Sequence, residues 1–184
     1  MSADNDVANY AALNKVDVVR ASRDGHTYHE AWAARSALEL LPPKTTLTAI
    51  AVEGFRIDDE DGLSSSAMEI ADLVRYYGGR TAKQANLIEV IQFKYSISNA
   101  EKPIRAADLT KTLRKFSETD RNLRDELGDE KVEKSVRYVF STNRPVHTNL
   151  SEALTGLTSN SELEGDAKKQ SDQLRAAVID GIPL

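Results

Sequence analysis

The chain contains no cysteine, which excludes disulfide bonds and thiolate metal sites. No apolar run approaches the roughly 20 residues that a membrane-spanning helix needs, so we expect no membrane partner. The first ten residues, MSADNDVANY, have neither the basic nor the apolar region of a secretory signal, which predicts a cytoplasmic protein. Basic residues are fewer than acidic ones, 24 against 29, and the net charge of −5 argues against wholesale coating of nucleic acid, although not against a local basic surface.

The length and composition predict one domain. Of the 184 residues, 40% are hydrophobic, enough for a sizeable core. Residues 1–24 are polar and weakly patterned, so we expect an arm there and a folded domain over residues 25–184. The sequence stops directly after a predicted helix, so the domain could belong to a longer protein.

The stretch Ala71–Ser96 organises the rest of the chain and predicts two neighbouring strands. Ala71–Tyr77 alternates and is rich in strand-forming residues. Gly78 and Gly79 then interrupt it, because glycine tolerates the positive φ of a chain reversal. Leu87–Tyr95 is almost continuously apolar, which is typical of a strand buried on both faces.

Polar residues occur in this hairpin where core residues are expected. Gln92 and Lys94 lie two positions apart and therefore point to the same face of the second strand. A lysine within a buried strand is costly unless it is paired, and Asp72 on the neighbouring strand is the obvious partner. Such departures from patterning often mark functional sites.

The flanking segments predict helices and two further strands. Thr27 and Glu30 form a capping-box pattern that opens a helix ending before Pro42. Its apolar stripe would consist of Ala31, Ala34, Leu38 and Leu41. The other predicted elements are a strand over Thr46–Arg56 that carries Glu53, an acidic loop over Asp58–Ser66, a helix over Ala106–Leu127 with Gly128 as its C-cap, a strand over Lys134–Ser141, a short helix opened by Asn149, and a helix over Gly165–Asp180. This order predicts an α/β fold with a small mixed central sheet flanked by helices.

Glu53, Asp72 and the run Gln92-Phe93-Lys94, on three successive predicted strands, resemble the core of the PD-(D/E)XK nuclease superfamily. In that restriction-endonuclease-like core, a helix precedes a three-stranded meander, and a second helix and a further strand follow. The predicted order matches over roughly residues 27–143. The helical stretch Gly25–Leu41 and the segments ADLV, IQFKYS and YVFSTNRP are similar to the nuclease domains of bacterial antiviral effectors of the CBASS and AVAST types. Those effectors are metal-dependent nucleases that degrade DNA once a sensor domain is triggered.

The resemblance implies a site and a chemistry. A Mg²⁺ or Mn²⁺ ion would be held by Asp72, by Glu53, by the amide oxygen of Gln92 and by the backbone carbonyl of Phe93. Lys94 would orient or activate the attacking water and offset charge at the phosphate. Gln92 stands where the family usually has an acidic residue. A glutamine at this position is known in the Mrr-like branches of the superfamily, and it leaves the site with one fewer charge for metal.

The same residues also have structural interpretations. Asp72 and Lys94 could form a buried salt bridge that only fixes the strand register. Gln92 alone is typical of a satisfied polar residue, and Glu53 of the polar end of a strand. Glu30 is placed like an extra first-helix ligand, but the capping box explains it better.

The histidines and the acidic loop give no site of their own. No spacing links His26, His29 and His147 as a metal site or a catalytic triad, so we expect surface or capping residues. The run Asp58–Asp61 lacks the spaced ligands of a calcium loop and is expected to be solvated.

The resemblance implies a metal-dependent endonuclease that cuts double-stranded DNA through backbone contacts with little sequence preference. Homo-oligomerisation on activation, and a sensor or NTPase domain in the same longer chain, are implied as well. Basic residues that could contact phosphate are Arg75, Arg80, Lys83 and Arg144, or the helical group Lys111, Arg114, Lys115, Arg121 and Arg124. The alternative function is a catalytically inactive nuclease-like module that binds nucleic acid or a partner.

Overall fold

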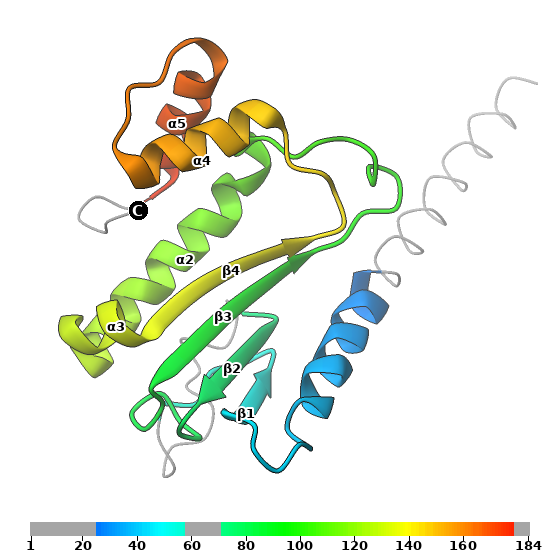
Figure 1. Ribbon diagram of the computed structural model, residues 1–184, viewed down its shortest axis with the longest axis vertical. Coiled ribbons are helices and arrows are strands. Elements are labelled where there is room, and N and C mark those ends of the chain that lie inside the picture. Colours follow the sequence, from blue (N-terminus) through cyan, green and yellow to red (C-terminus); the bar gives the residue numbers. More distant parts are fainter. Residues whose placement is uncertain (1–24, 58–70, 179–184) are drawn as a thin grey trace, which may run out of the picture.

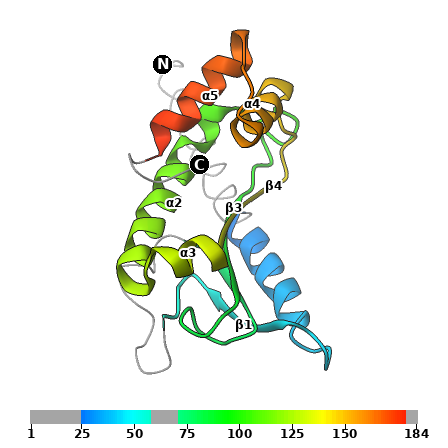
Figure 2. The same ribbon diagram turned by 60° about the vertical axis from the view of Figure 1, so that its left-hand side comes forward.

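The computed structural model describes residues 25–57 and 71–178 (Figures 1 and 2). The predicted polar arm, residues 1–24, and the predicted acidic loop, Asp58–Ser66, lie outside these described residues.

A four-stranded sheet forms the centre of the fold. The described chain begins with a helix over residues 25–38, called here the first helix, followed by β1 (Leu47–Val52), β2 (Leu73–Tyr77), β3 (Leu87–Lys94), α2 (Ala106–Leu127), α3 (Asp129–Ser135), β4 (Val136–Thr142), α4 (Thr148–Ser159) and α5 (Gly165–Ala177). The strands lie in the order β1-β2-β3-β4, the first three antiparallel and β4 parallel to β3. A helix, an antiparallel meander, further helices and a parallel fourth strand confirm the predicted α/β fold class and its restriction-endonuclease-like layout.

Helices cover both faces of the sheet. The first helix lies on one face, while α2 and α3 lie on the other, and α4 and α5 gather at one end of α2 (Figures 1 and 2). Alternation along β3 follows this division: Ile88 and Val90 pack in the cluster with α2 and α3, and Ile91 and Phe93 pack in the cluster with the first helix. This explains why β3 is apolar on both sides in the sequence.

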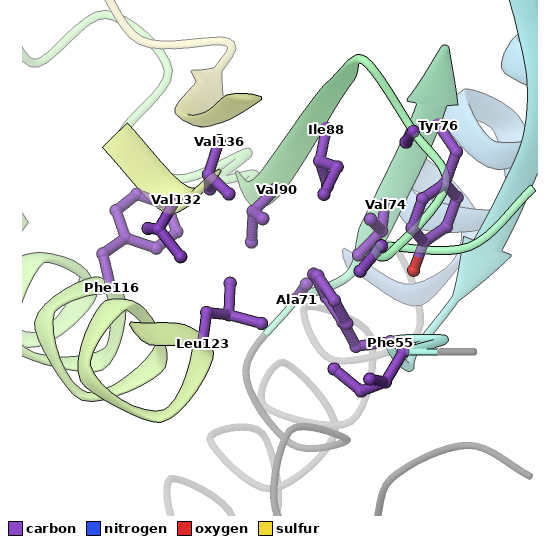
Figure 3. Packing of buried hydrophobic residues seen from close by; sticks show 13 residues of the cluster. Phe55, Ala71, Val74, Tyr76, Ile88, Val90, Phe116, Leu123, Val132 and Val136 are labelled. Atoms are coloured by element: carbon purple, nitrogen blue, oxygen red, sulfur yellow. The ribbon is translucent and has the colours of Figure 1, made fainter. Parts of the chain in front are cut away.

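The main core joins the sheet to α2 and α3 (Figure 3). Its members include Phe55, Val74, Tyr76, Ile88, Val90, Phe116, Leu123, Val132 and Val136. Tyr76 is 1% exposed and meets Phe55 edge to face, with ring centroids 5.9 Å apart. Burial raises the pKa of Tyr76 to about 12, and its hydroxyl accepts a hydrogen bond from the Arg56 amide at 2.7 Å. Burying each such large side chain fully contributes about 1.5–3 kcal/mol relative to exposure.

The predicted β2–β3 hairpin is confirmed, with a longer connection than a tight turn. Gly78 has a φ of +73°, which a side chain would strain. A Cβ at Gly79 would lie 2.4 Å from the backbone carbon of Gln84, so only glycine fits there. The Thr48 hydroxyl of β1 donates to the carbonyl oxygen of Tyr76 in β2 at 2.9 Å and accepts from the Gly79 amide at 3.2 Å, which fixes the start of the loop to β1.

The first helix forms, but two predictions about it are wrong. Residue 25 is already helical, so Thr27 lies inside the helix and is not its N-cap. All four residues of the predicted apolar stripe are exposed, and the buried positions are instead Ala33 and Ser36. Tyr28 and Trp32 set the helix rotation, because these large rings pack against Phe93 on the sheet.

The second half of the fold follows the predictions more closely. The bounds of α2 are confirmed, as is its C-cap Gly128, at a φ of +84°. Helix α3 was not predicted, and α4 begins two residues earlier than expected, since the His147 ring accepts from the Asn149 amide and caps it. From α5, Gln170 accepts a hydrogen bond at 3.1 Å from the amide of Ala106, the first residue of α2.

Candidate active site

Asp72 lies immediately before β2, where the pairing of β2 with β3 ends. Its amide donates to the carbonyl of Ile91 at 3.1 Å, and Leu73 is the first residue of the register with β3. Beyond that point the Asp72 carboxylate takes the hydrogen bond that a β2 carbonyl would otherwise accept from β3. Its Oδ2 accepts from the Phe93 amide at 2.6 Å and also from Gln92 Nε2 at 2.5 Å. The predicted proximity of Asp72 and Gln92 is therefore observed.

Gln92 is left with an unused acceptor. Its Nε2 must face Asp72, because an ionised carboxylate only accepts hydrogen bonds. Its Oε1 is buried and has no hydrogen-bond partner among the described residues. Buried polar atoms are rarely unsatisfied, and each exception calls for an explanation, such as a missing ligand.

Lys94 does not contact Asp72, which contradicts the predicted pair. Its Nζ donates to the backbone carbonyl of Asp108 in α2, at 2.8 Å. The alternation of side chains predicts the strand of Lys94 but not the residue at which β2 ends. Because β3 continues for three residues past its last β2 partner, Ile91, the strand that pairs with Lys94 in the described part of the chain is β4, and its side chain reaches the first turn of α2.

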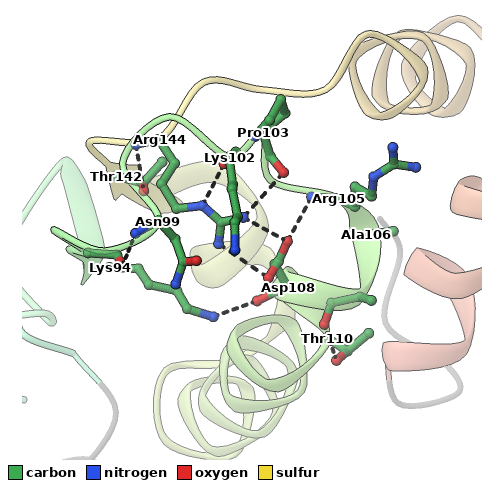
Figure 4. A network of polar contacts seen from close by, with 12 residues as sticks. Lys94, Asn99, Lys102, Pro103, Arg105, Ala106, Asp108, Thr110, Thr142 and Arg144 are labelled. Atoms are coloured by element: carbon green, nitrogen blue, oxygen red, sulfur yellow. Dashed lines mark hydrogen bonds and ion pairs between the residues drawn. The ribbon is translucent and has the colours of Figure 1, made fainter. Parts of the chain in front are cut away.

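Lys94 thereby joins a dense polar network, which we call the Asp108 clamp: Lys94, Asp108 and Arg144 (Figure 4). Arg144 contacts both carboxylate oxygens of Asp108 at 3.3 Å and donates to the carbonyl of Lys102 at 2.8 Å and that of Pro103 at 3.2 Å. Desolvation pushes the pKa of Asp108 upward, but the Arg105 amide, Arg144 and Lys94 outweigh it and hold that pKa below its usual value. The clamp ties the end of β4 to the start of α2.

Glu53 follows β1 and is exposed, with a φ of +50°. A left-handed conformation is unusual for glutamate and costs of the order of 1 kcal/mol or more. The Glu53 amide donates to the Asp72 carbonyl at 3.1 Å, so the two backbones are adjacent at this corner of the sheet. In the described ranges, however, no group of three His, Cys, Asp or Glu side chains is placed to hold a metal ion.

His29 is the neighbour of Asp72 that sequence reasoning missed. Its Nδ1 lies 3.7 Å from Asp72 Oδ1, and its ring centroid is 5.5 Å from that of Phe93. In the sequence, only its place on the first helix, next to Tyr28, could have indicated that His29 faces the sheet. Glu30, considered as an extra ligand, is exposed and pairs with His26 at 3.3 Å. We call Asp72, Gln92 and His29 the carboxylate site.

Some basic residues considered for phosphate binding are already engaged. Arg75 lies within β2 and pairs with Glu39 and Glu89, and Arg144 belongs to the clamp. Arg80 and Arg114 are exposed, as the contact prediction requires.

A separate cavity of about 480 Å³ lies between α2, α3 and β4, away from the carboxylate site. Its buried carboxylate is Asp120, which accepts from Arg124 at 2.5 Å and from the Tyr138 hydroxyl at 3.1 Å. Burial and Asp120 together raise the pKa of Tyr138. Because Asp120 is already satisfied on both oxygens, this cavity is a weaker candidate for catalysis than the carboxylate site.

Comparison with known proteins gives no family. No model of a known protein family matches the chain, and no curated protein matches it. In the described part of the chain, no helix has the length and apolar character needed to cross a membrane.

Proposed function

We propose that this domain is a metal-dependent DNA endonuclease that acts as the effector of a bacterial anti-phage defence system. The observation that carries the proposal is the contact between Asp72 and Gln92 at the ends of adjacent strands, within a restriction-endonuclease-like order of elements. The defence setting rests on the sequence resemblance alone.

The electrostatics of Asp72 favour a bound cation. Its side chain is only 18% exposed, and in the part of the chain that the structure describes no lysine or arginine forms an ion pair with it. Its amide donors carry no net charge, so a carboxylate there lacks a strong counter-charge. The unpaired Oε1 of Gln92 adds an oxygen ligand of the kind that Mg²⁺ accepts. The residues present therefore fit a divalent ion that retains several waters.

Each residue then has a role. Asp72 and the amide oxygen of Gln92 hold the ion, with Glu53 as a further ligand, directly or through water. Bound Mg²⁺ or Mn²⁺ supplies charge stabilisation at the phosphate and a more acidic water. The strained backbone of Glu53 supports this assignment, because such strain gathers at functional sites.

Lys94 supplies positive charge to the scissile phosphate. Its flexible four-carbon stem allows it to leave the Asp108 carbonyl, at a cost of about 1 kcal/mol for one hydrogen bond. Charge placed in advance near a developing oxyanion lowers the barrier to hydrolysis.

A second function is favoured by one observation. Asp72 caps the end of the β2–β3 ladder through the Phe93 amide, which is a complete structural role without any metal. A catalytically inactive nuclease-like module that binds nucleic acid or a partner would use Asp72 in this way.

Plasmid cleavage separates the two functions. Supercoiled plasmid is incubated with the metal-stripped protein in Mg²⁺, in Mn²⁺ and in EDTA, over a wide range of protein concentrations. The nuclease is expected to nick and linearise the plasmid only with metal, and more than proportionally at high concentration if oligomers are the active form. Cleavage that continues undiminished in EDTA contradicts the mechanism, and binding without cleavage under all conditions favours the inactive module.

A further inference from the structure

His29 places an imidazole nitrogen beside the carboxylate of Asp72. The ring is held between Phe93, at a centroid distance of 5.5 Å, and Tyr28, at 6.4 Å. These contacts fix the ring against the sheet, with 27% of the side chain exposed. A ring held in this way is already oriented for a ligand.

The distance between the two side chains fits a shared cation better than a hydrogen bond. Nδ1 of His29 and Oδ1 of Asp72 are 3.7 Å apart, which is too far for a hydrogen bond. Two neighbouring ligands at about 2.1 Å from one ion lie roughly 3 Å apart when they subtend a right angle at it. A side-chain adjustment of less than about 1 Å would therefore bring both atoms onto the same ion.

The other oxygen of Asp72 faces a second potential ligand. Gln92 contacts Oδ2, and its own Oε1 has no partner among the described residues. Side chains from the first helix, from the start of β2 and from β3 thus meet at Asp72: His29 lies beside Oδ1, and Gln92 contacts Oδ2 through its Nε2.

We propose that His29 is a direct ligand of the divalent cation, together with Asp72, and that the site therefore prefers cations of the Mn²⁺-to-Ni²⁺ series to Mg²⁺. Imidazole is a favourable ligand for the later transition metals, whereas Mg²⁺ favours oxygen ligands and water. The inference rests on the metal site of the proposed function, but it changes the ligand set, because the family resemblance assigns no role to His29.

Calorimetric titration of the EDTA-stripped protein with Mg²⁺, Mn²⁺ and Ni²⁺ tests this inference. The parent protein is expected to bind the cations in the affinity order Mg²⁺ < Mn²⁺ < Ni²⁺. His29→Ala should weaken Mn²⁺ and Ni²⁺ binding by at least ~10- to 100-fold, since loss of a supporting residue around a metal already costs that much. His26→Ala is the matched control: it removes a 64%-exposed histidine from the same helix and should change nothing.

A second variant separates metal binding from packing. His29→Asp replaces the imidazole nitrogen with a carboxylate oxygen. It should therefore bind Mg²⁺ more tightly than His29→Ala does, and its ratio of Ni²⁺ affinity to Mg²⁺ affinity should be smaller than that of the parent. If His29 only packs against Phe93, His29→Ala and His29→Asp will both lower the melting temperature of the metal-free protein, and the rise in melting temperature on adding Mn²⁺ will match that of the parent.

The outcomes distinguish this inference from the proposed function. Parent-like Mn²⁺ binding by His29→Ala, with plasmid still cut, overturns the inference alone. Mn²⁺ binding that requires His29, without cleavage of DNA, supports the inference and contradicts the nuclease. A parent protein that binds none of the three cations contradicts both.

Discussion

The carboxylate site and the Asp108 clamp lie near the same end of β3 but differ in how completely their polar atoms are satisfied. In the clamp, Asp108 accepts from Arg144 and from the Arg105 amide, and its carbonyl accepts from Lys94. In the carboxylate site, the partners of Asp72 among residues 25–57 and 71–178 are uncharged amide donors and a histidine at 3.7 Å, and Gln92 has an oxygen without a partner in these ranges. A satisfied network holds elements together, whereas an unsatisfied one has capacity to bind a ligand.

Lys94 connects the two groups. The family resemblance assigns it to catalysis, and its observed hydrogen bond assigns it to the clamp. Substitutions in the two groups should therefore have different effects on catalysis and on stability.

If the proposed nuclease function holds, Asp72→Asn should lower the cleavage rate at least ~10³-fold, because it removes the negative charge that would hold the cation and support charge stabilisation in the transition state. The amide keeps an acceptor for the Phe93 N–H, so the free energy of unfolding should fall by only about 1 kcal/mol. Plasmid cleavage and urea unfolding provide the two measurements. Asp125→Asn, the same change at an exposed position of α2, is the control and should leave both unchanged.

Lys94→Ala should lower the cleavage rate by roughly 10² to 10³-fold while costing about 1 kcal/mol in stability, since one hydrogen bond to a carbonyl is lost. Affinity for DNA should weaken little, because one phosphate contact among many is removed. Rates, DNA affinity and melting temperature are to be measured together. A folded variant that cuts at the parent rate would assign Lys94 to the clamp alone.

Arg144→Ala should destabilise the fold by about 2–3 kcal/mol, because the Asp108 carboxylate keeps only the Arg105 amide as a hydrogen-bond donor and the carbonyls of Lys102 and Pro103 lose their side-chain donor. The Arg144 side chain is only 10% exposed, so water replaces it poorly. Urea unfolding of this variant is compared with that of Arg114→Ala, at an exposed arginine of α2. Equal midpoints for the two variants would show that the clamp contributes no stability.

Asp108→Asn should have the smallest effect and lower the free energy of unfolding by about 1 kcal/mol. Asp108 is 34% exposed, so solvent screens its ion pair with Arg144. The sign of its pH dependence follows from the lowered pKa of Asp108 in the folded state. A depressed pKa stabilises the fold above the unfolded value of 3.8, and this contribution disappears as pH falls below 3.8. The stability difference between parent and variant should therefore shrink between pH 6 and pH 3, and a constant difference would contradict the assignment.

The sequence predicted the elements with a strong periodic pattern. The spaced apolar residues of α2, ended by Gly128, fixed the bounds of that helix, and alternation fixed β2 and β3. Helix α3, with the sequence DEKVEKS, has a single aliphatic residue and no apolar stripe, so pattern reasoning passed over it.

The site was predicted only in part, for geometric reasons. Alternation places Gln92 and Lys94 on one side of β3, but it does not say that β2 stops opposite Ile91. The residue at which a strand ends depends on tertiary packing. Here the end of β2 decides that Gln92 contacts Asp72, whereas Lys94 contacts α2. His29 was missed because its contact with Asp72 joins a helix to a distant strand end, which no local spacing encodes.

The hydrogen bond from the Ala106 amide to Gln170 joins α5 to the first turn of α2. Through it, α5 supplies the acceptor for the first amide of α2, four N–H groups of which have no partner within the helix itself. Two residues further along α2 is Asp108, whose carbonyl receives Lys94. A shortened protein without α5 would therefore lose more than a peripheral helix, because the start of α2 would fray and the anchor of Lys94 would move with it. The C-terminal helices are in this sense a support for β3, and a minimal version of the domain has to retain them.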